Sequence, residues 1–262
     1  MKTLIGMLVA AMLVAAPAYG VVLVSDNFDY AAGASLLDNG WVKSWPGSAV
    51  VYASDLEVID QGNAARFVES GNAGQVKVND AGRATIPAGM MVRLTGYLDP
   101  GDHANGGASK LATVDNSANW DQQYLEIEYV DSSVDRIKAK YITTGVVYST
   151  DFDGLGLNGT PIWATIEMSP DFGARFYYQL PNKNRVLYHE DAGAPNGGAT
   201  VEGLRIFGFN APASAVGYPG SALDPAIDTV LLELIPTQPV PEPATLGLLA
   251  IGAVSLLKRR RR

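Results

Sequence analysis

The stretch Tyr124-Leu125-Glu126-Ile127-Glu128-Tyr129-Val130 alternates between two sets of side chains. Because successive side chains of a strand point to opposite faces, Glu126 and Glu128 share one face while Ile127 lies on the other. The stretch therefore predicts a half-buried β-strand. The segment 136–143 alternates in the same way and places its basic residues on one face. An acidic strip beside a basic strip is favourable across strands, so the two segments predict an antiparallel pair.

Similar short runs of β-forming residues recur along the chain, separated by Gly, Asn, Asp and Ser. We expect further strands at 21–24, 49–52, 56–59, 64–68, 90–98, 162–168, 174–180, 185–189, 204–209 and 229–235. No segment of the sequence between residues 21 and 235 keeps a helical period of 3.6 residues. The chain is therefore predicted to be all-β, with one antiparallel two-sheet sandwich over residues 21–235.

The N-terminal segment, residues 1–20, has the pattern of a secretory signal peptide. Lys2 precedes an apolar run, and small residues follow at Ala16, Ala18 and Gly20. This order of charge, apolar core and small-residue cleavage site is typical of export signals. We expect cleavage after Ala18 or Gly20, and hence an exported protein.

The C-terminal segment has three parts. Residues 236–243 form a Pro-rich spacer that ends in Pro241-Glu242-Pro243, and prolines favour an extended backbone. Residues 244–257 are uncharged, and as a helix they would span about 21 Å of the roughly 30 Å hydrocarbon core. A basic cluster beside an apolar span stays on the cytoplasmic side, and long basic side chains reach the interface. We therefore expect a single membrane helix at 244–257, stopped by a cytoplasmic tail at 258–262 that consists of Lys258, Arg259, Arg260, Arg261 and Arg262.

This three-part ending resembles the PEP-CTERM sorting signal of exported bacterial envelope proteins. The resemblance rests on Pro241-Glu242-Pro243, on the short apolar span after it, and on the basic terminus. It implies that an exosortase recognises the tail and acts near the motif. It also implies a membrane-tethered precursor that crosses the inner membrane and is then released to the cell surface or the extracellular matrix.

The charge balance of the chain is strongly acidic once the two terminal segments are set aside. Six of the 19 basic residues lie in those segments, whereas 26 of the 27 acidic residues lie between them and only Glu242 lies within the spacer. Such a surface repels phosphate backbones, so we expect no nucleic-acid partner. The sequence contains no cysteine, so an exported domain of this length must be held by an apolar core rather than by disulfides.

Two parts of the predicted domain resemble the concanavalin A-like lectin and glucanase group. The stretch 25–30, Ser-Asp-Asn-Phe-Asp-Tyr, with Trp41 shortly after it, is similar to the first strand and loop of that group. The stretch 227–233, Ile-Asp-Thr-Val-Leu-Leu-Glu, is similar to its last strand. The resemblance implies a jelly-roll sandwich in which the last strand returns beside the first.

The sharpest enzymatic candidate is Glu126-Ile-Glu128-Tyr-Val-Asp131. Alternate residues of a strand can bring two carboxylates to the separation of about 5 Å that retaining glycosidases use. The stretch is similar to the Glu-x-Asp-x-x-Glu strand of family 16 glycoside hydrolases, with the second and third acidic positions exchanged. That resemblance makes Glu126 and Glu128 candidate catalytic residues. The alternative is an exposed acidic face whose carboxylates pair with Lys138 and Lys140.

Two groups of oxygen-bearing side chains are candidate calcium sites. Asp151, Asp153 and Asn158 have the spacing of a calcium loop, although the same residue types also favour a plain turn. Asp26 and Asp228 are the second candidate, because calcium-binding jelly-rolls often join their first and last strands through the ion.

Other signatures of catalysis are weak in this sequence. The chain has two histidines, His103 and His189, and no Gly-x-Ser-x-Gly motif. Several aromatic residues either stack on sugar rings or fill the core: Trp41, Trp45, Trp120, Trp163, Tyr177 and Tyr178. We therefore predict a non-catalytic envelope or extracellular-matrix protein with polysaccharide as its candidate ligand. The alternatives are a glycoside hydrolase that uses Glu126 and Glu128, and a purely structural surface-coat component.

Overall fold

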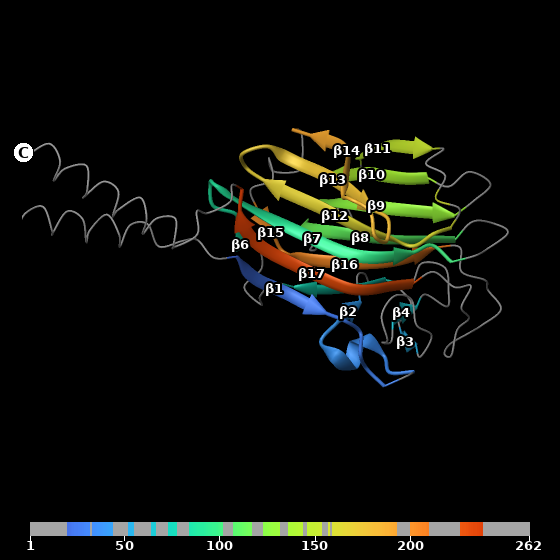
Figure 1. Cartoon of the computed structure of the whole chain (residues 1–262). Coiled ribbons are helices and arrows are strands. Elements are labelled where there is room, and N and C mark those ends of the chain that lie inside the picture. Colours follow the sequence, from blue (N-terminus) through green and yellow to red (C-terminus); the bar gives the residue numbers. More distant parts are fainter. Residues whose placement is uncertain are drawn as a thin grey trace, which may run out of the picture.

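The computed structural model describes residues 20–31, 33–43, 52–54, 64–66, 73–77, 84–101, 107–116, 123–131, 136–143, 146–153, 157, 159–192, 200–209 and 226–237. These residues form antiparallel strands with one short 3-10 helix (Figure 1). No helix in these ranges has both the length and the apolar character needed to cross a bilayer. The expected membrane helix at 244–257, the basic tail at 258–262 and nearly all of the expected signal peptide lie outside the described residues.

One sheet has eight strands, in the order β14-β13-β12-β7-β17-β4-β3, with β1 also paired to β17. Its strands are β1 (Val21–Asp26), β3 (Tyr52–Ser54), β4 (Ala64–Arg66), β7 (Met90–Asp99), β12 (Ile162–Ser169), β13 (Gly173–Gln179), β14 (Val186–Asp191) and β17 (Ala226–Pro236). The pairing of β1 with β17 aligns Asp26 with Val230 and Val21 with Leu234. The first and last strands of the described domain are therefore neighbours, as the resemblance to concanavalin A-like proteins implies.

The other large sheet has seven strands, in the order β11-β10-β9-β8-β16-β5-β2. Its strands are β2 (Val42–Lys43), β5 (Ala73–Lys77), β8 (Gly107–Asn116), β9 (Gln123–Asp131), β10 (Arg136–Thr143), β11 (Val146–Asp153) and β16 (Gly203–Phe209). A small two-stranded sheet joins β6 (Ala84–Thr85) to β15 (Thr200–Val201), and the 3-10 helix η1 spans Leu36–Asn39.

The two large sheets stack as layers with the apolar core between them (Figure 1). Strands β7 and β12 of one layer contact β8 and β9 of the other. Gly96 shows how closely the layers approach, because a Cβ atom at this position would lie 2.9 Å from Leu111 Cδ2. The core draws alternate residues from each strand, such as Ile127 and Tyr129 from β9, and Ile166 and Met168 from β12. The prediction of an antiparallel two-sheet sandwich is confirmed.

The antiparallel pair predicted for residues 124–130 and 136–143 is also confirmed. Strands β9 and β10 pair so that Lys140 lies opposite Glu126 and Lys138 lies opposite Glu128. Two long strands were not expected from the sequence, namely β8 and β11. The strand expected at 56–59 lies outside the described residues.

Candidate functional sites

Glu126 and Glu128 lie on the face of the seven-stranded sheet that points away from the core. Ile127 and Tyr129, which alternate with them along β9, belong to the core cluster between the two sheets. The carboxylates are nevertheless buried, with only 3% of Glu126 and 7% of Glu128 exposed. The expectation of an exposed acidic face at this position was therefore wrong.

A four-residue ion cluster, made of Lys110, Glu126, Glu128 and Lys140, explains how these carboxylates tolerate burial. Lys110 Nζ lies 3.3 Å from Glu128 Oε1 and 3.8 Å from Glu126 Oε1. Lys140 Nζ lies 3.4 Å from Glu126 Oε1, and Lys140 also donates to Glu128. Each carboxylate thus meets an ammonium from the strand on either side, which is the arrangement that buried charges require.

Of the two expected lysine partners, Lys140 pairs with both glutamates, and Lys138 lies opposite Glu128 in the strand pairing. A further cation, Lys110, comes from the unexpected strand β8 and also pairs with both glutamates. Asp131, the third acidic residue of the glucanase-like stretch, is the last residue of β9 and lies opposite Gly107. The two glutamates are therefore brought together on one face, in contact with lysine.

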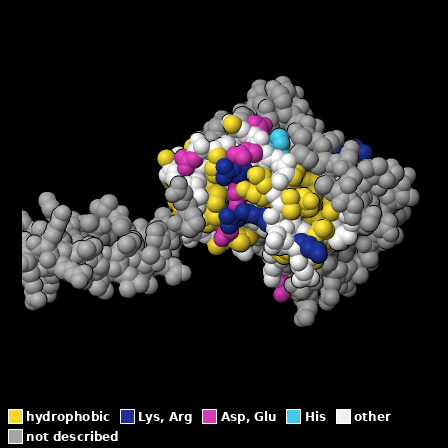
Figure 2. All heavy atoms as spheres, turned by 45° about the horizontal axis from the view of Figure 1, so that its top comes forward, with side chains coloured by type: hydrophobic (Ala, Val, Ile, Leu, Met, Phe, Trp, Pro, Cys, Tyr) yellow, Lys and Arg dark blue, Asp and Glu magenta, His cyan; other side chains and the backbone are white. Residues whose placement is uncertain are grey.

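The outward face of the eight-stranded sheet carries a second charged feature, which sequence analysis missed. In register across β17, β7, β12, β13 and β14, one row reads Glu233, Arg93, Glu167, Arg175 and Glu190. Acidic and basic residues alternate along this charged row, so every neighbouring pair is attractive. Figure 2 shows acidic and basic side chains gathered in a band, with apolar side chains beside them.

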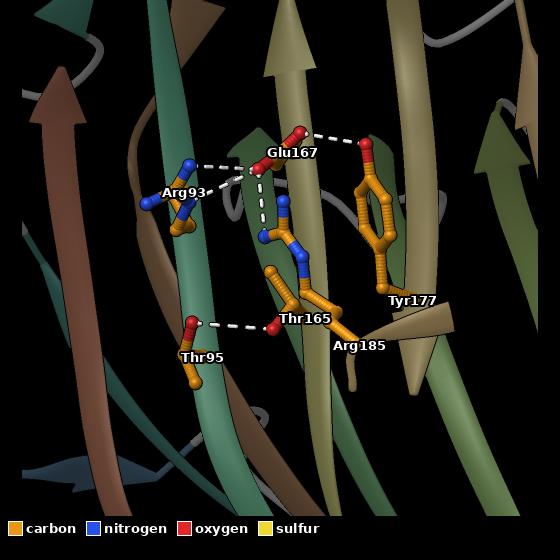
Figure 3. Close-up of polar contacts among 6 residues, drawn as sticks. All are labelled: Arg93, Thr95, Thr165, Glu167, Tyr177 and Arg185. Carbon is orange, nitrogen blue, oxygen red and sulfur yellow. Dashed lines mark hydrogen bonds and ion pairs between the residues drawn. The ribbon is translucent and has the colours of Figure 1, made fainter. Parts of the chain in front are cut away.

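Glu167 is the buried centre of the charged row (Figure 3). Its Oε1 atom accepts from Arg93 Nε at 3.0 Å and from Arg185 Nη1 at 2.9 Å, while Oε2 accepts from the Tyr177 hydroxyl at 2.9 Å. The Arg185 guanidinium also lies over the Tyr177 ring, 4.1 Å from its centroid. Burial, together with the hydrogen bond to Glu167, raises the pKa of Tyr177.

Trp163 and the Thr95–Thr165 pair lie on the same outward face as Glu167. Trp163 and Thr165 alternate along β12 with core residues, and Trp163 lies opposite Tyr97 of β7 and Gln179 of β13. Its ring meets that of Tyr97 edge to face at 5.2 Å between centroids. The Thr95 and Thr165 hydroxyls are 3.4 Å apart (Figure 3). This face therefore combines a half-buried aromatic with hydroxyl, amide and charged groups.

Asp26 lies at the centre of a hydrogen-bonded cluster at the end of β1. Its Oδ1 atom accepts from the Phe28 amide at 2.7 Å. Its Oδ2 atom accepts from the Tyr30 hydroxyl at 2.5 Å and from Trp41 Nε1 at 2.6 Å. Burial, with the hydrogen bond and the charge of Asp26, raises the pKa of Tyr30 to about 12. These contacts hold the loop after β1, in which Phe28 takes a positive φ of 55°, against the sheet.

The candidate calcium ligands that the structure describes belong to three strands, and Asp26 of β1 is aligned with Val230, two residues from Asp228 of β17. Asp228 is buried in β17 next to a β-bulge and accepts from Thr229 Oγ1 at 3.3 Å. Asp151 and Asp153 belong to β11, opposite Lys138 and Arg136, rather than to a loop. Asn158 lies outside the described residues. Within the described parts of the chain, no three acidic, His or Cys side chains come together as a metal site would require.

The remaining aromatic and histidine candidates that the structure describes pack against other residues of the fold. Trp41 is buried and donates to Asp26, and Tyr178 packs against the core. His189 of β14 lies opposite Phe176, with ring centroids 5.7 Å apart. Trp45, Trp120 and His103 lie outside the described residues.

Comparison with known protein families bears on the C-terminal segment. Residues 239–262 match the PEP-CTERM protein-sorting motif. The chain carries this sorting signal. The motif indicates a secreted protein that an exosortase processes for the cell surface or the extracellular space. No curated protein matches the sequence as a relative.

Solved structures resemble the sandwich at low sequence identity. The CBM2 module of the evolved Dit protein of Lactobacillus casei BL23 phage J-1 is 10% identical, with a TM-score of 0.50, over 84% of this chain and 98% of that one. The endo-1,3-beta-glucanase from Streptomyces sioyaensis is 17% identical, with a TM-score of 0.48, over 84% and 98%. The Bacillus licheniformis beta-glucanase is 11% identical, with a TM-score of 0.46, over 81% and 97%. The expected likeness to concanavalin A-like jelly-roll proteins is confirmed at the level of the fold.

Proposed function

We propose that this chain is an exported, non-catalytic envelope or extracellular-matrix protein that is sorted through its C-terminal tail and binds polysaccharide. In this proposal the signal peptide at 1–20 directs export and the apolar span at 244–257 holds the precursor in the membrane. The tail is removed or exchanged near Pro241-Glu242-Pro243.

The four-residue ion cluster is the observation that supports a non-catalytic role. A retaining glycosidase needs one carboxyl group that delivers a proton and a second that attacks the sugar. Here both Glu126 and Glu128 are buried and contact Lys110 and Lys140 within 4 Å. A sugar that took the place of the lysines would leave buried charges without partners.

Polysaccharide binding draws support from the outward face of the eight-stranded sheet. Trp163 offers a ring for stacking on sugars, and Gln179 and the charged row offer polar groups for sugar hydroxyls. The CBM2 module resembles this chain in fold, and the name of that module is consistent with a role in polysaccharide binding.

One pair of assays tests the proposal. The purified domain is screened on a glycan array, and every polymer that it binds is then incubated with it and assayed for new reducing ends. We expect binding without release of sugar. Binding to no glycan would favour a purely structural surface-coat component. Hydrolysis that is lost in Glu126→Gln would establish a glycoside hydrolase instead.

A further inference from the structure

The chain is held firmly at the point where it leaves the last strand. The Thr237 amide donates to the Gly89 carbonyl at 2.9 Å. The Thr237 hydroxyl lies 3.2 Å from the same carbonyl and 3.4 Å from Asp171 Oδ2. Asp171 Oδ2 in turn accepts from the Gly89 amide at 3.0 Å. The end of β17 is therefore joined to two turns of the same sheet.

Those two turns are also joined to each other by hydrogen bonds. Ser169 Oγ donates to the Met90 carbonyl at 2.8 Å and accepts from the Asp171 amide at 3.1 Å. Gly89 has a φ of +78°, which a residue with a side chain rarely adopts, so the turn before β7 depends on glycine. Thr237 is thus fixed to a rigid end of the sandwich.

The sorting motif begins very close to this fixed point. Only three residues, 238–240, separate Thr237 from Pro241. A fully extended chain covers at most about 3.3–3.6 Å per residue, so Pro241 lies within about 14 Å of Thr237. An enzyme that acts at Pro241-Glu242-Pro243 must therefore work next to the folded domain.

The beginning of β1 lies at the same end of the sandwich. Val21 is aligned with Leu234, and a Cβ atom on Gly20 would lie 2.7 Å from Ile235 Cγ2. Val21 and Val22 are 53% and 56% exposed, the highest values among the large apolar side chains that the structure describes as exposed. Apolar surface is therefore presented beside the exit point of the tail.

We propose that this tail-proximal end, defined by Val21, Val22, Gly89, Asp171 and Thr237, is a docking surface for the membrane-embedded enzyme that processes the sorting tail. The short distance to the motif forces the two proteins together, and the exposed valines supply apolar contact. This inference rests on the proposed sorting function. It adds that the folded domain, and not the tail alone, takes part in recognition.

The test compares two double variants in a host that contains the processing enzyme. Val21→Thr/Val22→Thr keeps β-branched side chains and replaces one methyl group of each with a hydroxyl. Val186→Thr/Leu187→Thr is the matched control on the edge strand β14, where the original residues are 43% and 47% exposed. Pulse-chase labelling with intact-mass analysis follows removal of the tail, and thermal unfolding checks that both variants are folded.

We expect the first variant to lose its tail about 5- to 10-fold more slowly than wild type, because two apolar contacts are weakened, while the control keeps the wild-type rate. Equal rates for wild type and both variants would overturn the docking surface while leaving sorting intact. Wild-type protein that keeps Arg262 in this host would overturn the sorting function itself, and the inference with it.

A spacer variant separates docking from simple obstruction. A flexible eight-residue Gly-Ser segment inserted after Gln238 lowers the effective concentration of the domain near the enzyme. If the domain docks, the insertion slows processing and reduces the effect of Val21→Thr/Val22→Thr. Faster processing after the insertion would show that the domain merely obstructs the enzyme, and would contradict the proposal.

Discussion

Lys110 lies directly opposite Glu128 in the β8–β9 pair, with its Nζ atom 3.3 Å from Glu128 Oε1. Both side chains are buried, so removal of either one leaves the four-residue ion cluster with one charge in excess. We expect Lys110→Met and Glu128→Leu each to lower the free energy of unfolding by about 3 kcal/mol, and the double variant to lose much less than their sum. Urea unfolding of all four proteins measures this coupling. Additive losses would show that the pair does not interact.

Glu167→Gln tests the centre of the charged row. Glutamine keeps the shape of the side chain but leaves Arg93 and Arg185 without their shared carboxylate. We therefore expect the free energy of unfolding, measured in urea, to fall by about 2–4 kcal/mol. The matched control is Glu190→Gln, because Glu190 pairs with Arg175 at 3.0 Å in an exposed position. Exposed ion pairs contribute about 1 kcal/mol or less to the free energy of unfolding. Similar losses in the two variants would contradict a special role for Glu167.

Tyr30 is expected to make stability depend on alkaline pH. Its pKa is about 12 in the folded chain against an ordinary value of 10, so between these values the unfolded chain releases a proton that the folded chain retains. The contribution of Tyr30 is therefore fully present below pH 10 and is lost as pH rises toward 12. Urea unfolding of wild type and Tyr30→Phe should show a stability difference that shrinks over this range. A difference that stays constant would rule out the linkage.

Trp163 is expected to contribute to glycan binding. For any glycan identified on the array, we predict that Trp163→Ala weakens binding about 10-fold, and that Trp163→Phe, which keeps an aromatic ring, recovers most of it. Isothermal titration calorimetry gives both affinities. Unchanged affinity in Trp163→Ala would place the glycan on another surface.

Calcium is not expected to bind through Asp26. Three donors, from Phe28, Tyr30 and Trp41, already occupy most of the acceptor capacity of this carboxylate, and calcium would compete with them. We expect Asp26→Asn to lower the Tm equally with and without millimolar calcium. A calcium-induced rise that Asp26→Asn abolishes would contradict this. A rise abolished by Asp153→Ala would support the Asp151 segment as the site.

Strands with clear alternation could be predicted from the sequence, because burial of one face imposes the period directly. β9 and β10 are the strongest examples, and their register follows from complementary charge. β8 was missed because Gly107, Ala108, Ser109 and Lys110 open it with residues that have low strand propensity. Its position at the centre of the sheet comes from tertiary pairing with β9 and β16. The error affected the site, because β8 supplies Lys110.

The charged row was missed for a different reason. Glu167 and Arg93 each sit within a predicted apolar strand, and a charged residue in such a strand signals a partner on a neighbouring strand. The sequence alone does not show that β7 and β12 are adjacent, since β8 to β11 intervene along the chain. The sequence did contain a pattern that favours strand β11. Asp151 and Asp153 have the same spacing as Lys138 and Arg136, the residues that lie opposite them on β10.

The position of β17 between β1 and β7 has a consequence for the order of assembly. An exported chain that emerges with its N-terminus first delivers β1 early, whereas the strand that pairs with it arrives last. Until β17 emerges, β1 has no partner strand in the described sheet and the facing edge of β7 stays open to incorrect pairing. Since the sorting motif follows β17 by a few residues, the strand that closes the sheet and the sorting motif leave the export path almost together. Completion of the fold and arrival of the sorting signal are thus nearly simultaneous events.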